Sequence, residues 1–154
     1  MKKRMIYTAI ASLLFSLVVR AGSGKEGKIT GVISGAHCGV EGMVCAPSHD
    51  LRRAELPGVY TKDNNFYVLV NVPQSFLAQW PVQDVTVEGT IYEKEKGIFA
   101  KKMSVKDEDK WRAVFEDGNI IDDMGHKEKL TTAMEIDGKW YCANCAATHK
   151  KESK

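Results

Sequence analysis

A strict alternation of apolar and polar residues over 84–91 constrains the fold more than any other feature of the sequence. Val85, Val87, Gly89 and Ile91 alternate with Asp84, Thr86, Glu88 and Thr90. A two-residue period places the apolar side chains on one face of an extended strand, and so predicts a strand that is buried on one side only. Such a strand needs hydrogen-bonded neighbours, which favours an antiparallel sheet.

Further strand signals lie on both sides of this segment. We predict a strand over 28–34, a hairpin that joins 60–62 to 66–72 through a turn at 63–65, and a return strand after a turn at 94–97. In the hairpin, Phe66, Val68, Val70 and Val72 share one face, while Tyr67 and Leu69 indicate that the other face is covered too. Short helices are predicted over 49–56, after Ser48, and from Pro73, where Phe76, Leu77 and Trp80 would pack.

The order of these elements over 28–105 resembles the OB-fold, a small Greek-key barrel. The residues that carry the resemblance are Lys28–Ile33, Val85–Tyr92 and Gly97–Ala100. The resemblance implies a small OB-like barrel with short helices, and with the C-terminal β-hairpin, zinc-ribbon-like extension predicted below, the fold class is mainly β. The nucleic-acid binding of many OB-folds does not carry over, because no surface of aromatic and basic side chains is evident in the sequence.

The C-terminal third holds two Asp-Gly pairs, at 117–118 and 137–138, and Asp-Gly is a strong signal for a two-residue hairpin turn. The second pair predicts a hairpin in which Ile136 pairs with Lys139 and Met134 with Tyr141, so that Cys142 lies at the end of a strand. The apolar residues over 111–121 also fit a helix that ends at Gly118, and periodicity leaves both interpretations open.

The first residues have the pattern of a secretory signal peptide. Basic residues at 2–4 precede an apolar run from Met5 to Val19, and Ala21 ends the segment at a plausible cleavage position. This run is shorter than the ~20 residues that span a bilayer. The sequence therefore predicts a periplasmic or secreted protein with no membrane attachment after cleavage, the alternative being an uncleaved N-terminal anchor.

Charge limits the partners of the mature chain. The predicted signal peptide holds four of the 22 basic residues and none of the 20 acidic ones. Its removal leaves 18 basic and 20 acidic residues, a formal charge of −2. This balance gives no electrostatic reason to expect nucleic acid as a partner, which leaves a metal ion or an unknown protein. The predicted organisation is a signal peptide (1–21), a flexible leader (22–27), an OB-like barrel (28–106), an extension (107–149) and a basic tail (150–154).

The motif with the most chemical content is Cys142-Ala143-Asn144-Cys145. Two cysteines at this spacing can direct both sulfurs at one ion, and with the preceding hairpin they resemble half of a zinc ribbon. Thiolate, thioether and imidazole donors suit zinc or copper rather than calcium or magnesium. The candidate ligands are Cys142 and Cys145, then Cys38 and Cys45, then His37, His49, His126 and His149.

Two alternatives use the same cysteines without a metal. Outside the cytoplasm four cysteines indicate disulfides, with three possible pairings, in a stapled interaction module. A redox dithiol is the other alternative, but it needs a helix after the first cysteine, and the sequence predicts only a polar tail after Cys145. Asp122 and Asp123 are interpreted as a solvated turn, and no motif for enzymatic catalysis is present.

Overall fold

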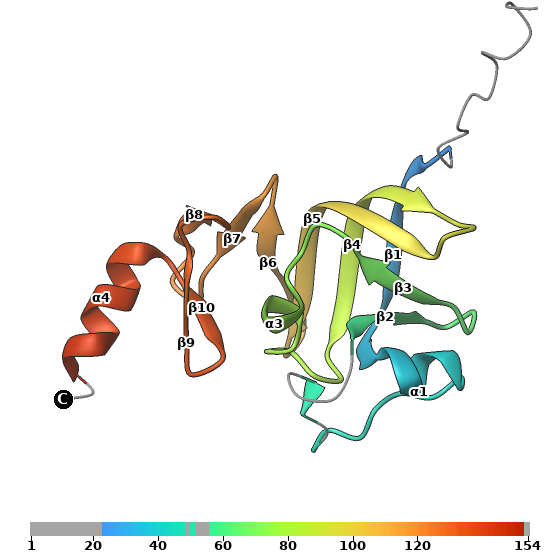
Figure 1. Ribbon diagram of the computed structural model, residues 1–154, viewed down its shortest axis with the longest axis horizontal. Coiled ribbons are helices and arrows are strands. Elements are labelled where there is room, and N and C mark those ends of the chain that lie inside the picture. Colours follow the sequence, from blue (N-terminus) through green and yellow to red (C-terminus); the bar gives the residue numbers. More distant parts are fainter. Residues whose placement is uncertain (1–22, 49, 52–55, 153–154) are drawn as a thin grey trace, which may run out of the picture.

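The computed structural model describes residues 23–48, 50–51 and 56–152. Its largest feature is a closed barrel of five strands (Figure 1). The strands are β1 (Lys25–Gly35), β2 (Pro57–Thr61), β3 (Phe66–Leu69), β4 (Asp84–Tyr92) and β5 (Gly97–Asp107). They follow the order β3-β2-β1-β4-β5, and a parallel pairing of β3 with β5 closes the barrel. The predicted fold class, mainly β with a small barrel, short helices and a C-terminal hairpin, is confirmed, and the closed barrel is compatible with an OB-like fold.

The alternation that predicted β4 matches its burial except at Thr86, which is 7% exposed although it lies on the polar face. Val85 and Val87 are fully buried and face the barrel interior, where Met103 and Val105 of β5 pack beside them. In β3 the buried residues are Tyr67 and Leu69. Val70, which follows β3, is 62% exposed. The apolar face predicted for Phe66, Val68, Val70 and Val72 is therefore open to solvent at this position.

Two short helices lie between barrel strands, α1 (Ala36–Val40) after β1 and α3 (Gln74–Leu77) after β3. Pro73 precedes α3, and Phe76 and Leu77 are buried as predicted, each only 1% exposed. The helix predicted over 49–56 lies largely outside the described residues. Among the helices of the described part of the chain, none is long and apolar enough to span a membrane.

Strand β1 begins at Lys25, three residues before its predicted start. The prediction of a flexible leader over 22–27 is therefore wrong for 25–27, because these residues continue the ladder with β4, from Lys25 opposite Ile91 to Val32 opposite Asp84.

The chain continues beyond the barrel as a smaller C-terminal extension. Its elements are β6 (Lys110–Glu116), β7 (Asn119–Ile121), β8 (Lys127–Lys129), β9 (Met134–Ile136), β10 (Lys139–Tyr141) and α4 (Ala143–Glu152). Strands β6 to β8 extend the barrel sheet from β5, and β9 and β10 form a separate hairpin. Residues 111–121 thus form a hairpin, and its turn residues Asp117 and Gly118 have positive φ of 48° and 78°.

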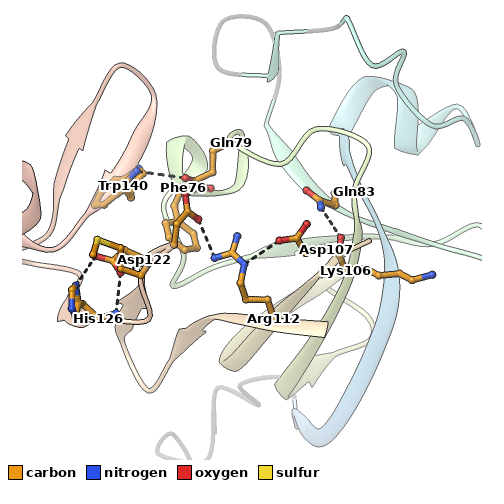
Figure 2. A network of polar contacts seen from close by, with 11 residues as sticks. Phe76, Gln79, Gln83, Lys106, Asp107, Arg112, Asp122, His126 and Trp140 are labelled. Carbon is orange, nitrogen blue, oxygen red and sulfur yellow. Dashed lines mark hydrogen bonds and ion pairs between the residues drawn. The ribbon is translucent and has the colours of Figure 1, made fainter. Parts of the chain in front are cut away.

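The second hairpin has the predicted register, with Lys139 opposite Ile136 and Tyr141 opposite Met134. Its Trp140 attaches it to the barrel: the indole lies edge-on to Phe76 at 6.0 Å between ring centroids (Figure 2). The Trp140 amide lies 3.5 Å from the side-chain oxygen of Gln79. The β9–β10 hairpin therefore packs against Phe76 of α3 and the nearby Gln79, while β6 joins the extension to the barrel sheet.

Close packing of β1 on β2 gives a first testable prediction. A Cβ atom at Gly31 would lie 2.2 Å from the backbone oxygen of Tyr60, so Gly31→Ala must push the two strands apart. We expect it to lower the free energy of unfolding by about 2 kcal/mol, measured by urea denaturation. Gly97→Ala is the matched control, because its Cβ atom would meet only the Val70 side chain at an ordinary 3.5 Å. Equal stability of the two variants would contradict this account of the barrel wall.

Candidate metal centre

The turn between β7 and β8 is built around a buried carboxylate. Asp122 follows β7, and its side chain is only 2% exposed. Its Oδ1 atom accepts the N–H groups of Met124 at 3.0 Å and of His126 at 2.9 Å. Gly125, with φ of +82°, supplies the left-handed residue that this tight turn requires. The prediction that Asp122 is solvated is therefore wrong, and the turn places His126 next to it.

The two cysteines of the Cys-x-x-Cys motif begin helix α4. The Cys142 carbonyl accepts the Ala146 N–H at 2.9 Å, and the Cys142 Sγ atom accepts the Cys145 N–H at 3.2 Å. Cys142 thus occupies the position of a helix N-cap, whose side chain satisfies an amide of the first turn. The predicted polar tail after Cys145 is wrong, because the alanine-rich segment after this cap is helical.

The turn and the helix start bring four donor residues together. The ligand atoms of Asp122, His126, Cys142 and Cys145 all lie within 4.8 Å of one another. His126 Nδ1 is 3.2 Å from the Cys145 sulfur and 3.6 Å from Asp122 Oδ2 (Figure 2). Around tetrahedral zinc, with bonds of 2.0–2.3 Å, neighbouring donors are separated by about 3.3–3.8 Å. The two distances from His126 Nδ1 are close to this range, and the widest separation in the cluster, up to 4.8 Å, would have to shorten by about 1 Å around an ion.

One oxygen of the buried carboxylate is left for an additional partner. Asp122 Oδ2 is buried and, within the described residues, makes no hydrogen bond of standard geometry to a nitrogen or oxygen. The Cys142 amide and the Cys145 thiol lie close enough to stabilise its charge. A buried carboxylate oxygen without a full partner is costly, so this atom is well suited to bind a cation.

The ionised Asp122 carboxylate favours a cation, whereas the Cys145 thiol would have to release its proton to bind one. Burial raises the pKa of Asp122, but hydrogen bonds from the His126 backbone, the Cys145 thiol and the Met124 and Cys142 backbones outweigh it, and the pKa is lowered. The pKa of Cys145 is raised to about 12 by its hydrogen bond with Cys142, by burial and by the Asp122 carboxylate. The negative charge of Asp122 thus opposes a thiolate beside it, and a divalent ion would compensate both.

The other predicted ligands lie elsewhere. Cys38 and Cys45 belong to α1 and the loop after it, at the opposite end of the molecule from α4 (Figure 1). Cys45 is 3% exposed, and its sulfur accepts the Gly35 N–H at 3.1 Å, which is a structural role in the barrel. His37 is exposed beside Glu41, 3.5 Å away. His49 and the side chain of His149 lie outside the part of the chain that is described.

Asp122 was missed because its sequence neighbourhood is that of an ordinary polar turn. A usable signal was its position directly after Ile120 and Ile121, four residues before a histidine, with a glycine between them. The cluster takes Cys142, Cys145 and His126 from the predicted ligands and replaces the second cysteine pair of a zinc ribbon with an aspartate and a histidine.

Comparisons with known proteins assign no function to this chain, so the candidate site rests on its geometry. No family model matches the chain, and neither the curated proteins nor the solved structures include a match. The cluster is the one group of three or more histidine, cysteine or acidic residues, within the described segments, whose ligand atoms lie close enough together to hold an ion. It is therefore the candidate site.

Proposed function

We propose that this chain is an exported, non-enzymatic protein that binds one zinc ion through Asp122, His126, Cys142 and Cys145. The observation that carries the proposal is the convergence of these four donor atoms within 4.8 Å, with a buried carboxylate oxygen among them. The leader sequence supports export.

The donor set favours zinc over other ions. Two thiols and an imidazole are soft or intermediate donors, which disfavours calcium and magnesium. The carboxylate is a hard donor, common around zinc and a poor match for copper(I). Four protein ligands complete a tetrahedral zinc site and leave no open position for a substrate, as in structural rather than catalytic sites.

The proposed ion joins two parts of the extension. Asp122 and His126 belong to the turn between β7 and β8, which continues the barrel sheet, whereas Cys142 and Cys145 begin α4 after the separate β9–β10 hairpin. Zinc would fix the hairpin and α4 to the barrel sheet and so present the helix in one orientation, for protein recognition or metal handling.

The geometry disfavours thiol–disulfide exchange even though the cysteines begin a helix. An exchange centre needs an accessible thiol that ionises easily. Cys142 is only 7% exposed, and the pKa of Cys145 is raised to about 12 by Cys142, by burial and by Asp122. Without a metal, the remaining possibility for these two residues is a disulfide in a stapled interaction module.

Intact mass of protein purified from the periplasm tests the proposal. We expect a chain that lacks its first 21 residues, a native mass that exceeds the denatured mass by one zinc ion, and alkylation of Cys142 and Cys145 only after chelation. Cys45 is the control, because it lies outside the cluster. Its alkylation under denaturing conditions should be the same with and without chelator. A chain without a bound ion, in which Cys142 and Cys145 lose two hydrogens as a disulfide, would contradict zinc binding and establish the stapled module.

A further inference from the structure

The N-terminal half of β1 has one hydrogen-bonding edge that no described strand covers. Residues 25–32 pair with β4 along one edge, whereas β2 pairs with the other edge only from Gly31 to Gly35. The backbone groups of 25–30 on this second edge therefore face no strand within the described segments. An uncovered edge of this kind is a template for pairing with another extended chain.

A pocket of about 620 Å³ borders this edge, and five consecutive residues, 28–32, line it. Side chains of a strand alternate between its two faces, so consecutive residues can line one pocket only where the edge of the strand faces it. The pocket continues along Tyr60 and Thr61 of β2. It is therefore a groove with a strand edge along one side, which we name the β1 groove.

The floor of the β1 groove is apolar, and hydrogen bonds fix the orientation of its two tyrosine rings. Ile29 and Ile91 line it together with Tyr60 and Tyr67. The Tyr67 hydroxyl donates to Glu93 at 2.6 Å and the Tyr60 hydroxyl to the Asn64 side chain at 2.7 Å, so the rings are oriented without a ligand. A preformed apolar floor of this size accepts one aliphatic or aromatic side chain.

Carboxylates lie near both ends of the groove. Asp84 is opposite Val32 in the ladder, and Glu93 follows Ile91, which is opposite Lys25. The charged residues that line the groove are three carboxylates, Asp63, Asp84 and Glu93, and two lysines, Lys28 and Lys62. Lys28 already pairs with Glu88 at 3.2 Å, and Glu93 pairs with Lys96 at 3.8 Å. Asp63 and Asp84 then remain with Lys62, so the net charge offered to a ligand is still negative. This charge is complementary to a chain with basic residues on both sides of an apolar one.

We propose that the β1 groove binds an extended peptide segment of a partner protein, which adds as a strand to the uncovered edge of β1. The main chain of the peptide pairs with residues 25–30, one apolar side chain enters the floor, and flanking Lys or Arg residues meet Asp84 and Glu93. Main-chain pairing supplies affinity and the side-chain pocket supplies specificity in this mode of recognition. The site is on the barrel and does not depend on the proposed zinc ion.

The test uses the full chain and a pool of capped heptapeptides, Thr-Lys-Thr-X-Thr-Lys-Thr, in which X is Val, Ile, Leu, Phe or Tyr. We expect NMR titration to shift the amides of 25–32. In a strand pair, successive N–H groups of the added chain point alternately toward and away from its partner. N-methylation of alternate peptide residues should therefore weaken binding at least about tenfold for one set and leave the other set unchanged.

A charge-reversal variant and its control complete the test. Asp84→Lys should weaken binding about tenfold at low ionic strength, because it removes one attractive contact and adds a repulsive one. Asp109→Lys, on the exposed turn between β5 and β6, should bind as the unchanged protein does. The proposal is overturned if no peptide binds at millimolar concentration, if N-methylation acts without alternation, or if a second copy of the chain covers the edge in solution.

Discussion

Cys142→Ser is expected to abolish stoichiometric zinc binding while the barrel and the start of helix α4 remain intact. Changing a group that merely orients a zinc ligand costs about 10- to 100-fold in affinity, so loss of a thiolate ligand should cost more than about 100-fold. Serine is a good N-cap, and its hydroxyl can accept the Cys145 N–H as the Cys142 sulfur does at 3.2 Å. Competition with a chromophoric chelator measures the affinity.

Cys45→Ser is the matched control for this variant. Its sulfur is buried in the barrel beside Ser34 and Gly35, remote from the cluster, so the variant should keep one zinc per chain even if it is somewhat less stable. Circular dichroism checks that both variants are folded. Unchanged zinc affinity in Cys142→Ser would exclude this cysteine as a ligand and with it the proposed site.

Removal of zinc by a chelator is expected to loosen the C-terminal extension and leave the barrel unchanged. Strands β7 to β10 are three residues long each, and Met124 and Met134 are 74% and 36% exposed. Apart from Ile120 in the core and the partly buried Leu130, Ala133 and Trp140 against it, little apolar burial holds this region. An ion present at 1,000 times its dissociation constant stabilises the bound form by about 4.1 kcal/mol. Chelation should then accelerate amide exchange over 119–148 by on the order of 1,000-fold.

Hydrogen exchange read by mass spectrometry, with and without chelator, follows this change segment by segment. Strands β1 to β5 should exchange at the same rate in both states, because they supply most of the hydrophobic core and none of the proposed ligands. The Cys142→Ser protein is the control, since a chelator has no zinc to remove from it. An extension that exchanges equally slowly with and without the ion would show that Trp140, Phe76 and the short strands suffice to hold it.

The barrel could be predicted because its signals are local. The alternation of Val85, Val87 and Ile91 depends only on the period of a strand, and Asp137-Gly138 fixes its own hairpin. The hairpin of 111–121 could not be separated from a helix, because Trp111, Val114 and Phe115 fit both periods. Pairing with β5 and β7 decides between them, and that pairing is not local.

The site could be predicted only in part, for the same reason. Cys142 and Cys145 can be identified by their spacing, and His126 by the metal-binding nitrogen of its imidazole ring. Asp122 becomes a candidate only once the β7–β8 turn and the start of α4 are folded against each other, because its burial depends on residues 20 positions further along the chain. Helix α4 was missed because its N-cap is a cysteine, which is not among the residues that usually signal a helix start.

The order of the two regions along the chain has a consequence for biogenesis. Every strand of the barrel ends by Asp107, and every proposed ligand lies at Asp122 or beyond. A chain that emerges N-terminus first, from a ribosome or an export channel, therefore presents all five barrel strands before the first ligand. The closing β3–β5 pair can form while Cys142 and Cys145 are still enclosed. Barrel assembly would then not wait for the metal supply, and the proposed ion would be acquired last.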